Sequence, residues 1–169
     1  MSSIAIPAAT PRHEEVRCDV PAAPADVFEH IDRPERLSAH MARKSWRLGG
    51  ASMSIETDSA GGHAVGSHIR LGGCVLGLAL NVECIVTQRE PPRFKAWQTV
   101  GTPRLLVIGP YRMSVAIEPI DCRGSCVIIA IDYALPPNRI WRWFGPTYAR
   151  WCVRQMARDL ARSFGGSTA

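Results

Sequence analysis

The sequence has no long hydrophobic run and none of the short motifs that mark common catalytic or nucleotide-binding sites. Its dense apolar stretches, such as Val127 to Ile131, have the length of a strand and fall far below the ~18 residues of a membrane-spanning helix. The GxSxG, HExxH, GxGxxG and P-loop patterns are all missing. These absences exclude a helical membrane span and the motif-bearing hydrolase, metalloprotease and nucleotide-binding classes, and we expect no cofactor and no metal.

Signals for export and for cysteine-based sites are also lacking. The six cysteines are scattered without a CxxC pair, and residues 1–13 contain no basic leader followed by an apolar block. We therefore expect reduced, mostly buried thiols and a cytoplasmic location. Cys122 and Cys126 flank a predicted turn, but no further ligand lies near them in sequence, so neither a metal nor a disulfide is favoured there.

Length and charge indicate one small globular domain. The chain has 169 residues and a formal net charge of +5, which is too modest to favour a nucleic-acid partner. Residues 1–13 are rich in Ala, Ser and Pro, which is typical of a flexible tail. We predict a single domain over residues 14–165.

Alternation of apolar and polar residues predicts a mostly antiparallel sheet. Glu14 to Val20 alternates with period two, which is typical of a half-buried strand. Pro24 to Ile31 and Asp32 to about His40 are predicted as two short helices, with Asp32 capping the second. Further strands are expected at Ser52–Asp58, Ser67–Gly73, Leu78–Arg89, Phe94–Val100, Arg104–Pro119 with a kink at Gly109-Pro110, and Val127–Leu135; a turn is expected at Gly101-Thr102-Pro103.

The last segment predicts the longest helix of the chain. Residues 138–144 are expected to form an aromatic connector, after which Gly145-Pro146 begins a helix that runs to about Phe164. Its apolar face is separate from a stripe of arginines spaced by four: Arg150, Arg154, Arg158 and Arg162. Like charges at this spacing repel, so the stripe indicates either a solvated outer face or peripheral contact with an anionic membrane or partner.

Three stretches resemble the START-like (SRPBCC) superfamily. They are Pro21 to Ile31, which resembles its opening strand-to-helix passage, Arg89 to Trp97, which resembles its E-P-P strand junction, and Asp132 to Pro136, which resembles the exit of its last strand. The bacterial polyketide cyclase/dehydrase and lipid transport members look nearest. The resemblance implies an α+β helix-grip fold, in which a curved antiparallel sheet of about seven strands carries two short helices after strand 1 and wraps a long C-terminal helix over its concave face.

The resemblance also implies an internal cavity for a hydrophobic small molecule. Inward positions of the predicted strands and of the long helix give the expected ligand-binding residues: Met53, Ile55, Leu80, Val82, Tyr111, Met113, Ile129, Tyr133, Tyr148, Cys152 and Met156. Weak catalytic candidates are His30, His40 and Tyr133, whose side chains can exchange or donate a proton. His68 and Arg70 share one face of a strand, for which the solvated outer side is favoured because Ile69 and Leu71 form the inward pair.

Three functional hypotheses remain open from the sequence. The first, which we favour, is binding or transport of a lipid, polyketide-like or isoprenoid molecule. The second is a polyketide cyclase/dehydratase-type enzyme acting on a molecule held in the same cavity. The third is an interaction module for anionic membrane surfaces or partner proteins, which would use the arginine stripe.

Overall fold

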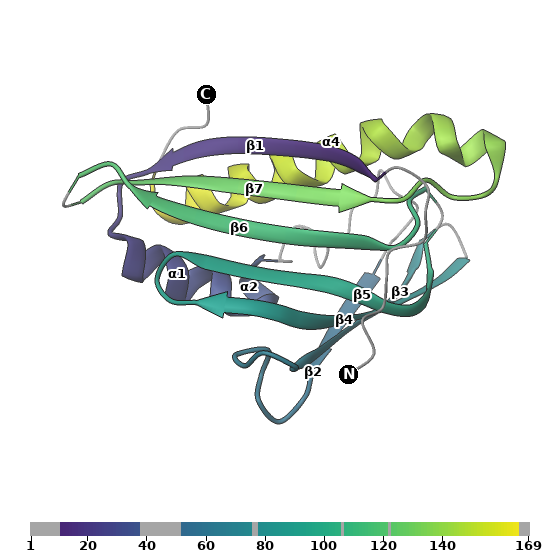
Figure 1. The fold of residues 1–169 in the computed structure, drawn as a ribbon, viewed down its shortest axis with the longest axis horizontal. Coiled ribbons are helices and arrows are strands. Elements are labelled where there is room, and N and C mark those ends of the chain that lie inside the picture. The colour runs from purple at the N-terminus through teal and green to yellow at the C-terminus, as the bar shows by residue number, and fades with distance from the viewer. Residues whose placement is uncertain (1–10, 38–51, 76–77, 106, 122, 166–169) are drawn as a thin grey trace.

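The computed structural model describes residues 11–37, 52–75, 78–105, 107–121 and 123–165. The described elements follow the order of the sequence (Figure 1): β1 (Arg12–Val20), α1 (Pro24–Asp32), α2 (Pro34–Leu37), β2 (Ser52–Thr57), β3 (His68–Val75), β4 (Leu78–Glu90), β5 (Phe94–Arg104), β6 (Tyr111–Pro119), β7 (Ser125–Tyr133) and α4 (Arg139–Ser163). No helix among these residues is both long enough and apolar enough to cross a membrane.

The seven described strands form one antiparallel sheet in the order β1-β7-β6-β5-β4-β3-β2. Each strand from β2 to β7 pairs with its neighbour in sequence, and β1 closes the order by pairing with β7, with Cys18 opposite Val127. The helices α1, α2 and α4 lie on one side of this sheet (Figure 1). The predicted helix-grip architecture is thus confirmed.

The core lies between the sheet and the helices, as the alternation predicts. In β6 and β7 the inward residues are buried and alternate with partly exposed ones. Val115 and Ile129 pair across these strands and are fully buried, and burial of such a side chain contributes ~1.5–3 kcal/mol. The buried face of α4 includes Ala149, Val153 and Leu160, and this helix packs mainly against β1 and β7.

The fifth strand is longer than the sequence indicates. Gly101-Thr102-Pro103 was expected to turn the chain, but these residues belong to β5, which ends at Arg104. The register against β4 shifts between Asn81 and Glu83, and Gly101 has a φ of +67°. The Gly-Thr-Pro sequence therefore accommodates a bulge instead of a turn, because glycine tolerates positive φ and proline is allowed at a bulge.

The long helix begins earlier than predicted, at Arg139, and continues through Pro146. The expected aromatic connector is therefore its first part, although proline lacks the N–H that a helix interior needs. Gly145 allows this part to pack closely against Val107 and Leu135: a Cβ on it would lie 2.9 Å from both the Val107 carbonyl oxygen and Leu135 Cδ2. Local sequence preference predicts that the helix starts only at Gly145-Pro146. In the structure it is continuous through these residues and is closely packed there.

The first helix ends one residue later than predicted. Asp32 is the last residue of α1 and is buried, whereas the sequence assigned it as the N-cap of the second helix. The described part of that second helix, α2, begins at Pro34. The carboxylate of Asp32 is instead used for tertiary contacts with the sheet, which sequence-local capping rules do not anticipate.

Candidate ligand pocket

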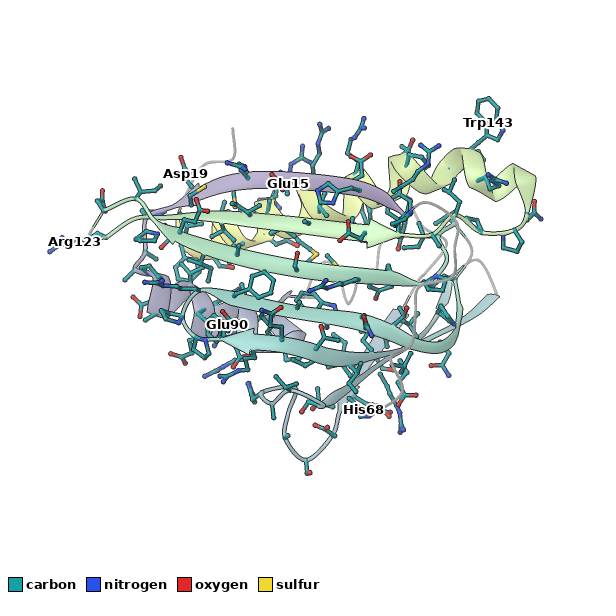
Figure 2. All side chains as sticks on the ribbon, in the orientation of Figure 1. Glu15, Asp19, His68, Glu90, Arg123 and Trp143 are labelled. Atoms are coloured by element: carbon teal, nitrogen blue, oxygen red, sulfur yellow. The ribbon has the colours of Figure 1, made fainter. Side chains whose placement is uncertain are left out.

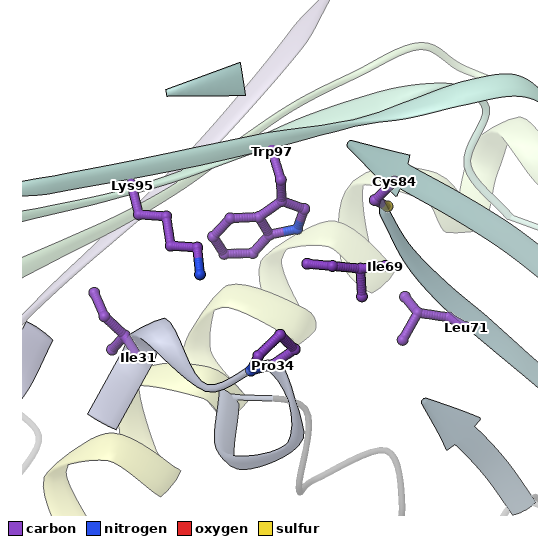
Figure 3. Close-up of a pocket in the computed structure, with 7 residues that line it drawn as sticks. All are labelled: Ile31, Pro34, Ile69, Leu71, Cys84, Lys95 and Trp97. Carbon is purple, nitrogen blue, oxygen red and sulfur yellow. The ribbon is translucent and has the colours of Figure 1, made fainter. Parts of the chain in front are cut away.

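A small, mostly apolar pocket lies between the first two helices and the concave face of the sheet (Figure 3). Its free volume is about 30 Å³, which is enough for one or two water molecules. Side chains from α1 and α2 face side chains from three strands across it: Ile31, Pro34, Ile69, Leu71, Cys84, Lys95 and Trp97. The pocket is therefore a seam between two layers, and separating the layers would enlarge it.

Deeper in the core, polar atoms interrupt the apolar surface. The Tyr111 hydroxyl lies 3.5 Å from the Sγ of Cys84, which lines the pocket. Burial raises the pKa of Cys84 to about 11, and burial together with Cys84 raises the pKa of Tyr111 well above its ordinary value. At neutral pH both groups stay protonated and neutral, so they can donate or accept a hydrogen bond but cannot act as a base.

A second Tyr–Cys pair, on α4, approaches the first. The electrostatic neighbours of Tyr111 include Tyr148 and Cys152. The proximity of Cys152, together with burial, raises the pKa of Tyr148, and burial raises the pKa of Cys152 to about 12. Three of the predicted ligand-binding residues, Tyr111, Tyr148 and Cys152, are thus brought together by the fold. They form an uncharged polar region in which Tyr111 and Cys152 are buried and Tyr148 packs against the core.

A buried ion pair borders the pocket on its other side. The Lys95 side chain is only 2% exposed, and its ammonium group donates to Asp32 Oδ1 at 2.7 Å. It also donates to the backbone oxygens of Asp32 and Gly62, both at 2.9 Å. A lysine in so apolar a place keeps its charge only when its donors are satisfied, so this cluster fixes the end of α1 against β5.

Asp32 also binds two further basic side chains. Arg89 Nη2 and His63 Nδ1 each lie 2.9 Å from its Oδ2. Burial alone would raise the pKa of this carboxyl group, but hydrogen bonds from Arg89, Lys95 and His63 outweigh it and hold the pKa well below its ordinary value. The carboxylate is therefore charged throughout the neutral range and acts as an anchor for α1, β4, β5 and the loop after β2.

Most of the other predicted ligand-binding residues point into the interior. Val82, Met113, Ile129, Tyr133 and Met156 are buried members of the core, and Ile55 is partly buried and packs against it. The side chains of Met53 and Leu80 lie outside the described residues. Contact of these residues with a ligand remains a prediction.

The weak catalytic candidates do not meet at the pocket among the described residues. The His30 ring packs edge-on against Phe164, with ring centroids 5.3 Å apart, and its pKa is lowered by burial and by Arg36 and Arg33. Tyr133 is buried, and its hydroxyl has no hydrogen-bond partner within the described part of the chain. Its pKa is raised by burial and by Glu14 of β1. His40 lies outside the described residues.

Sequence reasoning named Ile69 and Leu71 as inward residues but missed Lys95 and Pro34 as pocket walls. Lys95 was missed because charge normally marks the solvated face of a strand. One signal was available in the sequence: by alternation, Lys95 shares its side of the strand with Trp97 and Thr99. In the structure all three side chains are buried. The partner of Lys95, Asp32, is 63 residues away in sequence, so only the fold could pair them.

On the outer face of the sheet, a hollow of about 290 Å³ is lined by polar side chains: Glu56, Thr57, Asp58, His68, Arg70 and Glu83. His68, labelled in Figure 2, and Arg70 both bind Glu83 Oε1, at 3.0 and 3.1 Å. This confirms the favoured outer placement of the two basic residues. No group of three His, Cys, Asp or Glu side chains within the described ranges is arranged to hold a metal ion.

Comparisons with known proteins agree with the architecture. A family model described as polyketide cyclase / dehydrase and lipid transport matches residues 12–164. Similar solved structures include norcoclaurine synthase from Thalictrum flavum in complex with dopamine and hydroxybenzaldehyde, with a TM-score of 0.64, 12% identity, and coverage of 91% of this chain and 87% of that one.

Two further structures show the same fold at similarly low identity. A solution structure from Thermobifida fusca has a TM-score of 0.65 and 16% identity over 90% of this chain and 93% of that one. The major latex-like protein 151 of Panax ginseng has a TM-score of 0.63 and 14% identity over 92% and 99%. No curated protein matches the chain in sequence. The predicted START-like membership is confirmed by the family match, which spans nearly the whole sequence, and the chain belongs to the polyketide cyclase / dehydrase and lipid transport family.

Proposed function

We propose that the chain binds an apolar or amphipathic small molecule, such as a lipid, a polyketide-like intermediate or an isoprenoid, and carries it in the cytoplasm. The observation that supports this most directly is the apolar seam between the α1–α2 layer and the sheet (Figure 3). Membership of a family that includes lipid transport points the same way. Concave, mostly apolar sites with a few polar groups are typical of small-molecule binding.

Binding requires the seam to widen, because about 30 Å³ holds no lipid-sized molecule. The Asp32–Lys95 ion pair fastens the end of α1 to the sheet, so we expect the wall to stay fixed there. Pro34, which belongs to α2 and follows the anchor, faces Leu71 and Ile69 across the seam. We therefore expect the ligand to enter by displacing α2 from β3 while α1 remains in place.

The interior polar region would select among apolar ligands. Neutral Tyr111 and Cys84 lie behind the seam and already bond to one another. A ligand with a single carbonyl or hydroxyl group could replace that weak sulfur contact with a stronger oxygen hydrogen bond. We expect a mostly apolar ligand with one buried polar group, and no preference for a buried charge.

The primary experiment is native mass spectrometry of freshly purified protein, followed by organic extraction and identification of the released molecule. A stoichiometric apolar adduct would support the proposal and reveal the ligand class. Protein that carries no adduct and is not stabilised by any member of a panel of fatty acids, isoprenoids and aromatic polyketides would refute it.

A matched pair of variants connects binding to the seam. Leu71→Phe fills the seam from β3, whereas Ile85→Phe adds the same ring on the opposite face of neighbouring β4, where Ile85 is only partly buried. Binding of anilinonaphthalene sulfonate to folded protein is expected to fall at least tenfold in the first variant and to stay unchanged in the second. Equal binding by both variants would place the probe elsewhere.

Chemistry on the bound molecule is the second candidate, a cyclase or dehydratase-type reaction. It is favoured by the Tyr111 hydroxyl, which remains protonated and could polarise a ligand carbonyl. Incubation of the ligand extracted from Tyr111→Phe protein with wild type and with the variant would test it, since a reaction would release water or change connectivity only with the wild type. The third hypothesis, contact with anionic surfaces, concerns the outer side of α4 and is compatible with either.

A further inference from the structure

The positive charge of the protein is concentrated in α4. This helix contains six arginines and one aspartate, a net charge of +5, which equals the formal net charge of the whole 169-residue chain. The remainder of the sequence is therefore electrically balanced. The inner face of α4 is buried against β1 and β7. Five of its arginines are exposed: Arg142, Arg150, Arg154, Arg158 and Arg162.

Aromatic side chains are exposed on the same helix. Trp143 is 84% exposed, Phe144 56% and Trp151 42%. Figure 2 shows Trp143 at the first part of α4, pointing away from the sheet. Positions 143, 147, 151, 154 and 158 recur at intervals of three or four residues and so share one side of a helix. A group of large aromatic side chains exposed to this extent marks a surface that contacts an apolar partner or a membrane.

The protein neutralises only part of the arginine stripe. Arg150 binds Glu14 of β1 with two hydrogen bonds of 3.0 and 3.1 Å, and Arg162 lies 3.5 Å from Asp159. Arg154 and Arg158, between them, are exposed and form no ion pair within the described residues. Two neighbouring cations beside the exposed aromatics thus have no partner anion in the part of the chain that the structure describes. Like charges at this spacing repel, so an external anion would stabilise them.

We propose that the outer face of α4, defined by Trp143, Phe144, Trp151, Arg154 and Arg158, docks the protein on a membrane surface that contains anionic phospholipid. Arginines reach the lipid phosphates while Trp and Phe side chains enter the boundary between headgroups and acyl chains. A second copy of the chain fits less well, because it would bring the same cationic face against this one. The inference does not depend on ligand binding in the seam.

The test is co-sedimentation of the full chain with vesicles of phosphatidylcholine alone and of phosphatidylcholine mixed with phosphatidylglycerol, at low and high NaCl. We expect binding only to the anionic vesicles and release by salt, since the attraction is screened. Each arginine facing the surface strengthens partitioning about fivefold. Arg154→Gln/Arg158→Gln should therefore weaken it on the order of 25-fold, and Trp143→Ser should weaken it further.

The matched control, Arg93→Gln/Arg112→Gln, removes the same charge from the β4–β5 turn and the outer face of β6. It should leave partitioning within about twofold of wild type if the α4 face makes the contact. Equal loss in both double variants would show that bulk charge alone is responsible and would overturn the proposal. Equal binding to both vesicle types, binding to neither, or self-association abolished by Trp143→Ser would overturn it as well.

Discussion

Replacement of Lys95 by methionine should destabilise the protein substantially, because the buried ammonium group donates hydrogen bonds to three oxygen atoms. It donates to Asp32 Oδ1, Asp32 O and Gly62 O at 2.7–2.9 Å. Methionine keeps similar volume but donates nothing, which leaves two backbone oxygens and part of a carboxylate without their partner. Removing one member of a buried pair costs about 3–5 kcal/mol.

The cost should fall at the lower end of that range, near 3 kcal/mol, because Arg89 and His63 still contact Asp32 in the variant. For a domain of this size, each kcal/mol lowers the Tm by about 2–4 °C, so a shift of roughly 6–12 °C is expected. Urea unfolding followed by circular dichroism and tryptophan fluorescence gives the free energy directly. Arg93→Met, an exposed cation two residues away, is the matched control and should change stability by less than ~0.5 kcal/mol.

The difference between wild type and Lys95→Met should also depend on pH. The pKa of Asp32 in the folded protein lies below the ordinary value of 3.8, so its contribution is fully present above that value and is lost as the pH falls through the lower folded value. The gap between the two proteins should therefore be constant from neutral pH down to about 5 and shrink below about 4. A Lys95→Met protein within 1 kcal/mol of wild type at pH 7 would refute a buried, fully bonded ion pair.

Further outcomes follow from packing and burial. Gly145→Ala should lower stability by about 1–3 kcal/mol in thermal unfolding, since its Cβ would meet Val107 O at 2.9 Å; a raised Tm, as helix propensity alone predicts, would contradict that contact. Cys84 and Cys152, whose pKa values burial raises to about 11 and 12, should resist iodoacetamide at pH 8 until urea unfolds the chain, as mapped by mass spectrometry; rapid native labelling would show that the core is open. Arg150→Ala removes the ion pair with Glu14. Because the Arg150 side chain is largely exposed, the loss in unfolding free energy should be under ~1 kcal/mol in urea unfolding. A larger loss would assign this ion pair a structural role.

Much of the fold could be predicted because burial follows local periodicity. The alternation in β1, β6 and β7 reports directly which side chains meet the core, and the antiparallel order follows from short connections between successive strands. Tyr111 and Met113 were assigned inward on that basis and are buried. The long helix was recognised from its apolar face, although its first residues were not.

The candidate site was less predictable, since its polar members are identified only by distant partners. Cys84 and Tyr111 come from non-adjacent strands, β4 and β6. Asp32 directly follows the helix predicted at Pro24 to Ile31, and aspartate is a preferred N-cap residue, so local rules predict that it caps the next helix. The sequence predicts a turn at Gly101 where the structure has a bulge, because glycine and proline indicate a break in local structure without distinguishing a turn from a bulge.

The sequence by itself determined the strand and helix faces, the overall architecture and the family, because each rests on patterns of neighbouring residues and on their order. The tertiary structure alone decided where charge is neutralised. It buried Lys95 against Asp32, joined Arg150 to Glu14, and left Arg154 and Arg158 exposed. Ion pairing depends on distances between groups far apart in the chain, and those distances exist only after the sheet has closed around its helix.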